Sequence, residues 1–83
     1  MPVATLVILD TGELGVVVAP SPNPKAIHRP MVRIIADADG NRLAEGPIRD
    51  LTEVDPDTGR PRRSIARSTD PERYGVKVSE YVA

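Results

Sequence analysis

Two apolar runs joined by a short polar link dominate the start of the chain. The first is Leu-Val-Ile-Leu at residues 6–9, the second is Leu-Gly-Val-Val-Val-Ala at residues 14–19, and Asp-Thr-Gly-Glu joins them. β-Branched residues favour strands, and a short polar link that contains glycine favours a hairpin. We expect a type I turn at Asp10 and Thr11, followed by Gly12 in the left-handed conformation. The sequence therefore predicts a β-hairpin here.

The rest of the chain predicts further short strands, because its apolar residues are mostly Val and Ile and 9 prolines interrupt it. With the first pair at residues 5–9 and 14–19, the expected strands are 31–36, 42–45, 48–54, 62–67 and 74–78. Gly40 and Gly59 predict two more turns, and the Pro-rich residues 20–29 predict an extended loop. Asp70 is predicted to cap one helical turn at residues 70–73.

The predicted fold class is all-β, either a small SH3-like barrel or a strongly bent meander of five or six short strands. We expect the 83 residues to form a single domain, with a core at 3–54, an Arg-rich extension at 55–69 and a C-terminal turn and strand at 70–83. A chain this short buries only about 60–65% of its unfolded surface. It contains no Phe, Trp or Cys to compensate, so a partner surface is expected.

Both faces of the first hairpin are apolar. We expect Val7, Leu9, Val16 and Val18 to share one face and the remaining apolar residues to share the other. The candidate interface on that second face comprises Leu6, Ile8, Val17 and Ile35. Three covers are open: a second copy of the chain, a neighbouring domain, or the chain's own C-terminal residues Tyr74, Val76, Val78 and Tyr81.

Residues 7–12, Val-Ile-Leu-Asp-Thr-Gly, resemble the motif of aspartic peptidases, in which two carboxylates share a proton across a dimer axis. A second Asp-Thr-Gly begins at Asp57. However, Glu13 stands where that family has Ala or Ser, and the second copy follows Asp55 and Pro56 instead of an apolar strand. We therefore interpret Asp10, Thr11 and Gly12 as a turn and keep a homodimeric aspartic peptidase as an alternative.

Metal ligands are sparse in this sequence. His28 is the single histidine and has no carboxylate cluster beside it in the sequence. Asp37, Asp39 and Asn41 begin like a calcium loop, but Gly40 comes at the fourth position instead of the sixth. We predict no catalytic, cofactor-binding or metal-binding residue in this chain.

Five arginines form the candidate anion-binding segment, namely Arg60, Arg62, Arg63, Arg67 and Arg73. Guanidinium groups bind phosphate in bidentate fashion, so a nucleotide or nucleic acid is an alternative partner. Arg63 and Arg67 have the Arg-x-x-x-Arg spacing of PilZ-type cyclic-di-GMP receptors, but the second motif of that family is missing. Only two aromatic residues are present for base stacking, and nearby acidic residues offset the arginines. We favour a solvated, salt-bridged surface.

Two longer patterns carry a family resemblance. Residues 12–17, Gly-Glu-Leu-Gly-Val-Val, are similar to the turn of KOW modules in ribosome and transcription factors. From Leu9 to Leu51 the Gly-Glu-Leu-Gly-Val-Val hairpin is followed by Asn-Pro, Arg-Pro-Met-Val, Asp-Ala-Asp-Gly and Ile-Arg-Asp-Leu. In this order they resemble the small C-terminal β module of bacterial HD-GYP metal-dependent phosphohydrolases, which are associated with cyclic-di-GMP hydrolysis. The resemblance covers residues 3–51. Asp-Pro-Glu-Arg-Tyr at residues 70–74 and the strand expected after it also resemble the family's ending, and residues 52–69 look inserted.

The resemblance implies an accessory, non-enzymatic role. The catalytic residues of that family are a His-Asp pair, further His and Asp metal ligands and a Gly-Tyr-Pro loop, and this chain contains no His-Asp pair and no Gly-Tyr-Pro. The expected partner is a parent catalytic domain or a second copy of the chain. The net charge of −1 and the lack of an apolar run of about 20 residues predict a cytoplasmic protein without a membrane partner.

Overall fold

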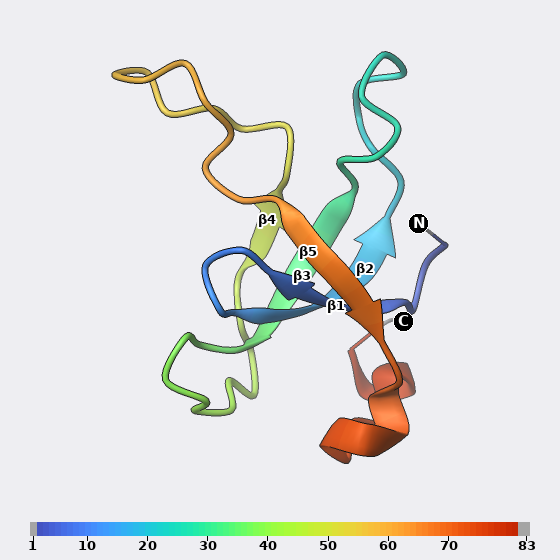
Figure 1. Cartoon of the computed structure of the whole chain (residues 1–83). Helices are drawn as coiled ribbons and strands as arrows, with labels where there is room; N and C mark the ends of the chain where they lie inside the picture. Colours follow the sequence, from blue (N-terminus) through green and yellow to red (C-terminus); the bar gives the residue numbers. More distant parts are fainter. Residues whose placement is uncertain (1, 82–83) are drawn as a thin grey trace.

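The computed structural model describes residues 2–81, and within them the chain forms one antiparallel sheet (Figure 1). Its strands are β1 (Leu6–Leu9), β2 (Leu14–Ala19), β3 (Met31–Ala36), β4 (Ile48–Asp50) and β5 (Ile65–Thr69). Two short 3-10 helices follow, η1 (Pro71–Tyr74) and η2 (Val78–Glu80). The strand order is β4-β3-β2-β1-β5, so the all-β prediction is confirmed as an open sheet and not as a closed barrel.

The short-range sequence patterns predict the positions of the first three strands closely. β2 and β3 occupy the expected residues, and β1 is one residue shorter than expected. Gly12 and Gly40 have φ values of 88° and 86°, which glycine adopts without a side-chain clash. Asp70 caps η1, because its Oδ1 accepts a hydrogen bond from the backbone N–H of Glu72 at 3.0 Å. These turns and the cap confirm the predictions made from their sequences.

Four predicted strands differ from the structure, those at 48–54 and 62–67 in their bounds only. Residues 42–45 contribute one bridge, from Arg42 to Ala36, and β4 ends at Asp50. The strand expected at 62–67 is displaced to Ile65–Thr69. Residues 74–78, expected as a strand, contain the end of η1 and the start of η2, because Val76 turns onto the sheet face instead of extending its edge.

A bulge in the pairing of β5 with β1 separates the faces of Ile65 and Arg67. β5 pairs with β1, with Arg67 opposite Ile8 and Ile65 opposite Leu9, and the register shifts between them. Ile8 and Leu9 are adjacent on β1, so their side chains point to opposite faces of the sheet. Their partners Arg67 and Ile65 therefore also lie on opposite faces. Strict alternation along the strand expected at 62–67 predicts that Arg63, Ile65 and Arg67 share one face, and the bulge separates Ile65 from Arg67.

The core consists of two clusters, one on each face of the sheet. Leu6 and Val7 are adjacent on β1 and belong to different clusters. The first cluster contains Leu6, Leu14, Val16, Ile35, Ala36 and Val76. The second contains Val7, Leu9, Val17, Val32, Ile34 and Leu51. A sheet with apolar residues on both faces needs a cover on each.

The chain covers both faces itself. Val76, Val78 and Tyr81 pack on the first cluster, whereas Leu51, Leu43 and Ile65 complete the second. The C-terminal residues therefore supply one of the three covers left open by the sequence, although Tyr74 is 40% exposed. Among residues 2–81, no helix is long and apolar enough to cross a membrane.

The candidate interface is corrected by this packing. Leu6, Val17 and Ile35 are completely buried within the chain, and Ile8 is half-buried against the first cluster. Leu6 pairs with Val16 in the hairpin, so these two share a face and Val17 lies on the other. The grouping expected from the sequence put Val16 and Val17 on the wrong faces, because the register of the turn could not be read from the strands alone.

Candidate functional site

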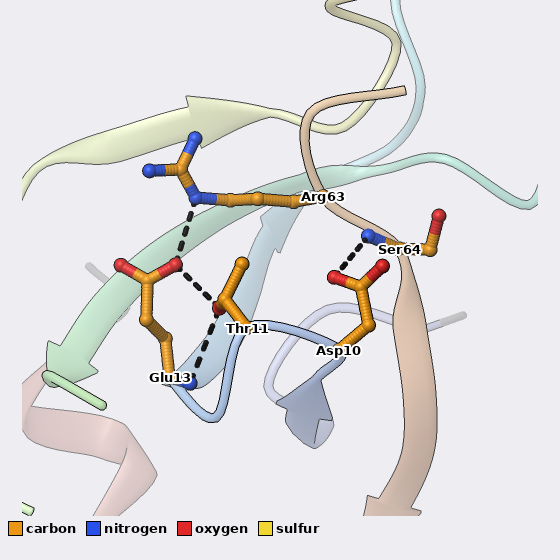
Figure 2. Close-up of polar contacts among 5 residues, drawn as sticks. All are labelled: Asp10, Thr11, Glu13, Arg63 and Ser64. Carbon is orange, nitrogen blue, oxygen red and sulfur yellow. Dashed lines mark hydrogen bonds and ion pairs between the residues drawn. The ribbon is translucent and has the colours of Figure 1, made fainter. Parts of the chain in front are cut away.

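The end of the first hairpin and the segment entering β5 form a polar cluster of five residues (Figure 2). The turn closes with hydrogen bonds from the backbone N–H of Leu9 to Glu13 O at 2.9 Å and from that of Gly12 to Leu9 O at 3.0 Å. Thr11 Oγ1 accepts from the backbone N–H of Glu13 at 3.2 Å and donates to Glu13 Oε1 at 2.7 Å. The turn therefore holds the Glu13 carboxylate in a defined place.

Asp10 connects the hairpin to residue 64. Its backbone N–H donates to Ser64 O at 2.9 Å, and its Oδ1 accepts from the Ser64 backbone N–H at 3.0 Å. The side chain of Asp10 thus continues the pairing of β1 with β5 beyond the end of β1. This carboxylate performs a structural task, in agreement with its interpretation as part of a turn.

The second Asp-Thr-Gly is also a turn. The backbone N–H of Asp57 donates to Asp55 Oδ1 at 2.8 Å, and that of Gly59 donates to Asp55 O at 2.7 Å. This turn lies in the loop between β4 and β5 that projects from the sheet at the upper left of Figure 1. Both copies of the motif therefore have a structural explanation.

Arg63 pairs with the hairpin. Its Nε donates to Glu13 Oε1 at 2.8 Å, and the two side chains are 23% and 18% exposed. The other four arginines of the candidate anion-binding segment, Arg60, Arg62, Arg67 and Arg73, are exposed. Arg60 and Arg62 lie in the projecting loop, whereas Arg73 lies in η1 at the lower end of Figure 1. The five arginines therefore do not form a single cluster.

Arg29, which the sequence placed in the Arg-Pro-Met-Val part of the family pattern without giving it a role, ties three segments together. Its Nη1 donates to Leu51 O at 3.2 Å and to Arg63 O at 3.1 Å, and its Nη2 donates to Ser64 Oγ at 3.2 Å. Its place after the Pro-rich loop gave no signal for this role, because the partners are 22 to 35 residues away. His28 beside it is exposed.

The calcium-like sequence is a turn as well. Asp37 Oδ1 accepts from the backbone N–H groups of Asp39 at 3.0 Å and Asn41 at 2.9 Å. The hydrogen bond from Asn41 holds the pKa of the Asp37 carboxyl below its ordinary value of 3.8. In residues 2–81 no three His, Cys, Asp or Glu side chains gather in a way that could hold a metal ion.

A family model described as a KOW domain associated with HD domain matches residues 6–75. The chain belongs to this family. No curated protein and no solved structure matches it. The family assignment confirms the resemblance to a module that accompanies HD domains, and it marks this KOW domain as an accessory and not a catalytic domain.

The match covers more of the KOW domain than the resemblance did. The resemblance covers residues 3–51 and the ending from residue 70, with 52–69 between them as an insertion, whereas the family match is one range from 6 to 75. The matched part includes all five strands and all five residues of the polar cluster. The cluster therefore lies within the matched residues of the KOW domain.

Proposed function

We propose that this KOW domain is a non-catalytic docking module of an HD-GYP type metal-dependent phosphohydrolase and that it contacts the catalytic domain of that enzyme. The observation that carries the proposal is the family match over residues 6–75, since the family is described by its association with the HD domain. The specific link to HD-GYP enzymes rests on the sequence order from the Gly-Glu-Leu-Gly-Val-Val hairpin to Leu51.

The chemistry of the polar cluster supports a structural role. Asp10 accepts from Ser64, and Glu13 accepts from both Thr11 and Arg63. One oxygen of each carboxylate, Asp10 Oδ1 and Glu13 Oε1, thus accepts bonds that hold the hairpin against the segment entering β5. These bonds support a role for the cluster as a framework of the domain.

The experiment combines a hydrolysis assay with a binding assay. The purified chain is incubated with cyclic-di-GMP and Mn²⁺, and hydrolysis is compared with that of an HD-GYP catalytic domain encoded in the same genome. We expect no hydrolysis by the chain alone and co-elution of the chain with the catalytic domain in gel filtration. Hydrolysis by the chain that Asp10→Asn abolishes would overturn the non-catalytic assignment, and separate elution would overturn the docking role.

One observation favours a second function. Arg60, Arg62, Arg67 and Arg73 present exposed guanidinium groups, which suit the phosphates of a nucleotide or nucleic acid. The affinity of such binding falls as the salt concentration rises, because the release of counterions from the phosphates then contributes less free energy. Titration of fluorescent RNA, DNA and cyclic-di-GMP at low and physiological salt tests it, and no salt-dependent binding to any of the three would remove it.

A further inference from the structure

β5 forms one edge of the sheet. In the order β4-β3-β2-β1-β5, its inner side pairs with β1 and its outer side faces away from the sheet. Ala66, Arg67 and Ser68, the middle of this strand, are all exposed. The opposite edge is β4, with only three residues. Since very short edge strands offer little to a partner, β5 is the edge open to an added strand.

The direction of the backbone groups can be read from the hydrogen bonds of β1. The N–H of Leu9 points to Glu13 at the start of the second hairpin strand, and that of Asp10 points to Ser64. The backbone N–H and C=O groups of the even-numbered residues of β1 therefore point towards β5. Arg67 and Thr69 lie opposite Ile8 and Leu6 and therefore direct their backbone groups to β1.

Ser68 lies between Arg67 and Thr69, so it directs its N–H and C=O outward. Within residues 2–81, no hydrogen bond uses either group. An unpaired donor and acceptor on an exposed strand can be satisfied by a strand from another chain.

A cationic hollow adjoins this edge. It has a volume of ≈ 410 Å³ and is lined by His28, Arg29, Ser64, Ile65, Ala66 and Arg67, with no acidic residue among them. This volume lies within the range of sites that accept small ligands or side chains. Arg29 is fixed there by its bonds to main-chain oxygens and Ser64, and no carboxylate lies within ion-pair distance of it in the described residues. The hollow therefore favours acidic side chains.

A second copy of the chain is a poor occupant of the edge. In an antiparallel pair of two β5 strands, Arg67 would lie opposite or diagonal to Arg67 of the other copy. Like charges at such positions destabilise a strand pair. Charged side chains on an edge commonly prevent self-association for this reason.

Nucleic acid also fits the edge less well than a peptide. Stacking of bases needs aromatic side chains, and neither tyrosine lines the hollow beside β5. Tyr81 packs on the first core cluster, and Tyr74 lines a separate hollow with Arg42 and Leu14. An extended peptide, in contrast, uses the free N–H and C=O of Ser68.

We propose that the outer edge of β5 binds an extended acidic peptide segment as an added β-strand, with carboxylates placed over Arg67 and in the hollow at Arg29. The segment belongs to the HD-domain protein, so this source rests on the proposed docking function. Backbone bonds to Ser68 supply the pairing, and the arginines select acidic sequences.

The test is an NMR titration of the full ¹⁵N-labelled chain with a capped peptide of alternating Val and Glu. We expect shifts in the amide signals of Ile65–Thr69, Ser64 and His28, and at least about tenfold slower hydrogen exchange of the Ser68 N–H, which equals about 1.4 kcal/mol. A capped peptide of alternating Val and Lys is the matched control and should bind at least about tenfold more weakly. Equal binding of both peptides, or shifts only elsewhere, would overturn the proposal.

Two variants separate the backbone from the charge. Ser68→Pro removes the outward N–H, which has no partner in the sheet, and should abolish binding, whereas Ser68→Ala should bind as the wild type does. Arg67→Glu should reverse the preference between the two peptides, and it keeps the proposal testable if Ser68→Pro does not fold. An Arg67→Glu variant with unchanged preference would contradict the charge argument.

Three further outcomes distinguish the proposals. If oligouridine shifts the β5 signals and the acidic peptide does not, the edge binds nucleic acid and the peptide proposal fails. If the HD-domain protein binds the wild type and the Ser68→Pro variant equally, docking stands and the β5 proposal fails. If the peptide binds at β5 and the HD-domain protein does not bind, the β5 edge is a peptide-binding site and the docking role fails.

Discussion

Arg63 Nε lies 2.8 Å from Glu13 Oε1, although the two residues are 50 positions apart in the chain. Glu13 ends the turn of the first hairpin, and Arg63 precedes the outermost strand, β5. Beside this pair, Asp10 and Ser64 exchange two hydrogen bonds. Together these contacts fix the segment that leads into β5 against the hairpin and so define the edge that we propose as a binding surface.

The Arg63 and Glu13 pair should contribute measurably to stability. In a double-mutant cycle with Glu13→Gln and Arg63→Met, we expect a coupling energy of about 0.5–1 kcal/mol, because the pair is partly exposed. Urea unfolding at low and high salt measures it, and the coupling should decrease with salt. A coupling energy of zero at low salt would show that the contact does not stabilise the fold.

Asp10 offers a direct test of its role in the turn. Asp10→Asn keeps an oxygen that can accept from Ser64, so we expect unfolding free energy within about 0.5 kcal/mol of the wild type. Asp10→Ala leaves the Ser64 N–H without this acceptor and should cost about 0.5–1.5 kcal/mol. Urea unfolding of both variants measures the difference. Equal losses in both variants would indicate that the charge, and not the hydrogen bond, matters.

Gly46 is required by a close approach of two backbone segments. A Cβ at this position would overlap the carbonyl oxygen of Ile34, whereas a Cβ at Gly40 would meet nothing within 4 Å. We expect Gly46→Ala to cost at least about 3 kcal/mol, the upper end for overpacking. Gly40→Ala should cost only about 1–2 kcal/mol, from its positive φ. Thermal and urea unfolding would rank the two, and a smaller loss for Gly46→Ala would contradict the packing of residues 42–47 on β3.

Val76 tests the cover of the first face. It is 6% exposed and packs in the first cluster, whereas Val54 is 52% exposed. Val76→Ala should destabilise the domain by about 1–2 kcal/mol through the loss of buried methyl groups. Val54→Ala is the matched control and should change stability by no more than about 0.5 kcal/mol. If both variants unfold alike, the C-terminal residues do not cover this face.

Asp37 should make the free energy of unfolding depend on pH in the acidic range. Its pKa is held low in the folded chain, chiefly by the hydrogen bond from Asn41, so its contribution is present above its ordinary pKa of 3.8. That contribution is lost as the pH falls through the lowered pKa. We expect the free-energy difference between wild type and Asp37→Asn to diminish between pH 6 and pH 2. Urea unfolding across this range measures it, and a constant difference would contradict the assignment.

Sequence reasoning succeeded where structure is decided by neighbours. The turns at Gly12 and Gly40 and the cap at Asp70 depend on residues only a few positions apart, and all three were predicted. The strands β2 and β3 follow from their β-branched runs. The same locality explains why Asp10 could be interpreted as part of a turn.

Long-range pairing was the main source of error. The sequence shows no reason for residues 65–69 to pair with β1, and the bulge that separates Ile65 from Arg67 follows from that pairing. Gly46 lies close to the Ile34 carbonyl, and residues 42–45 join the sheet through the bridge from Arg42 to Ala36. The roles of Arg29 and Ser64 also depend on which segments meet, so a linear pattern could not reveal them.

Hydrogen–deuterium exchange of the chain, with and without the HD-domain protein, tests the central claim most directly. We expect a stable complex in which amide exchange slows in β5, most strongly at the Ser68 N–H. The exchange rates of the two buried clusters should remain unchanged. An HD-domain protein that leaves exchange unaltered along the whole chain would contradict the docking role.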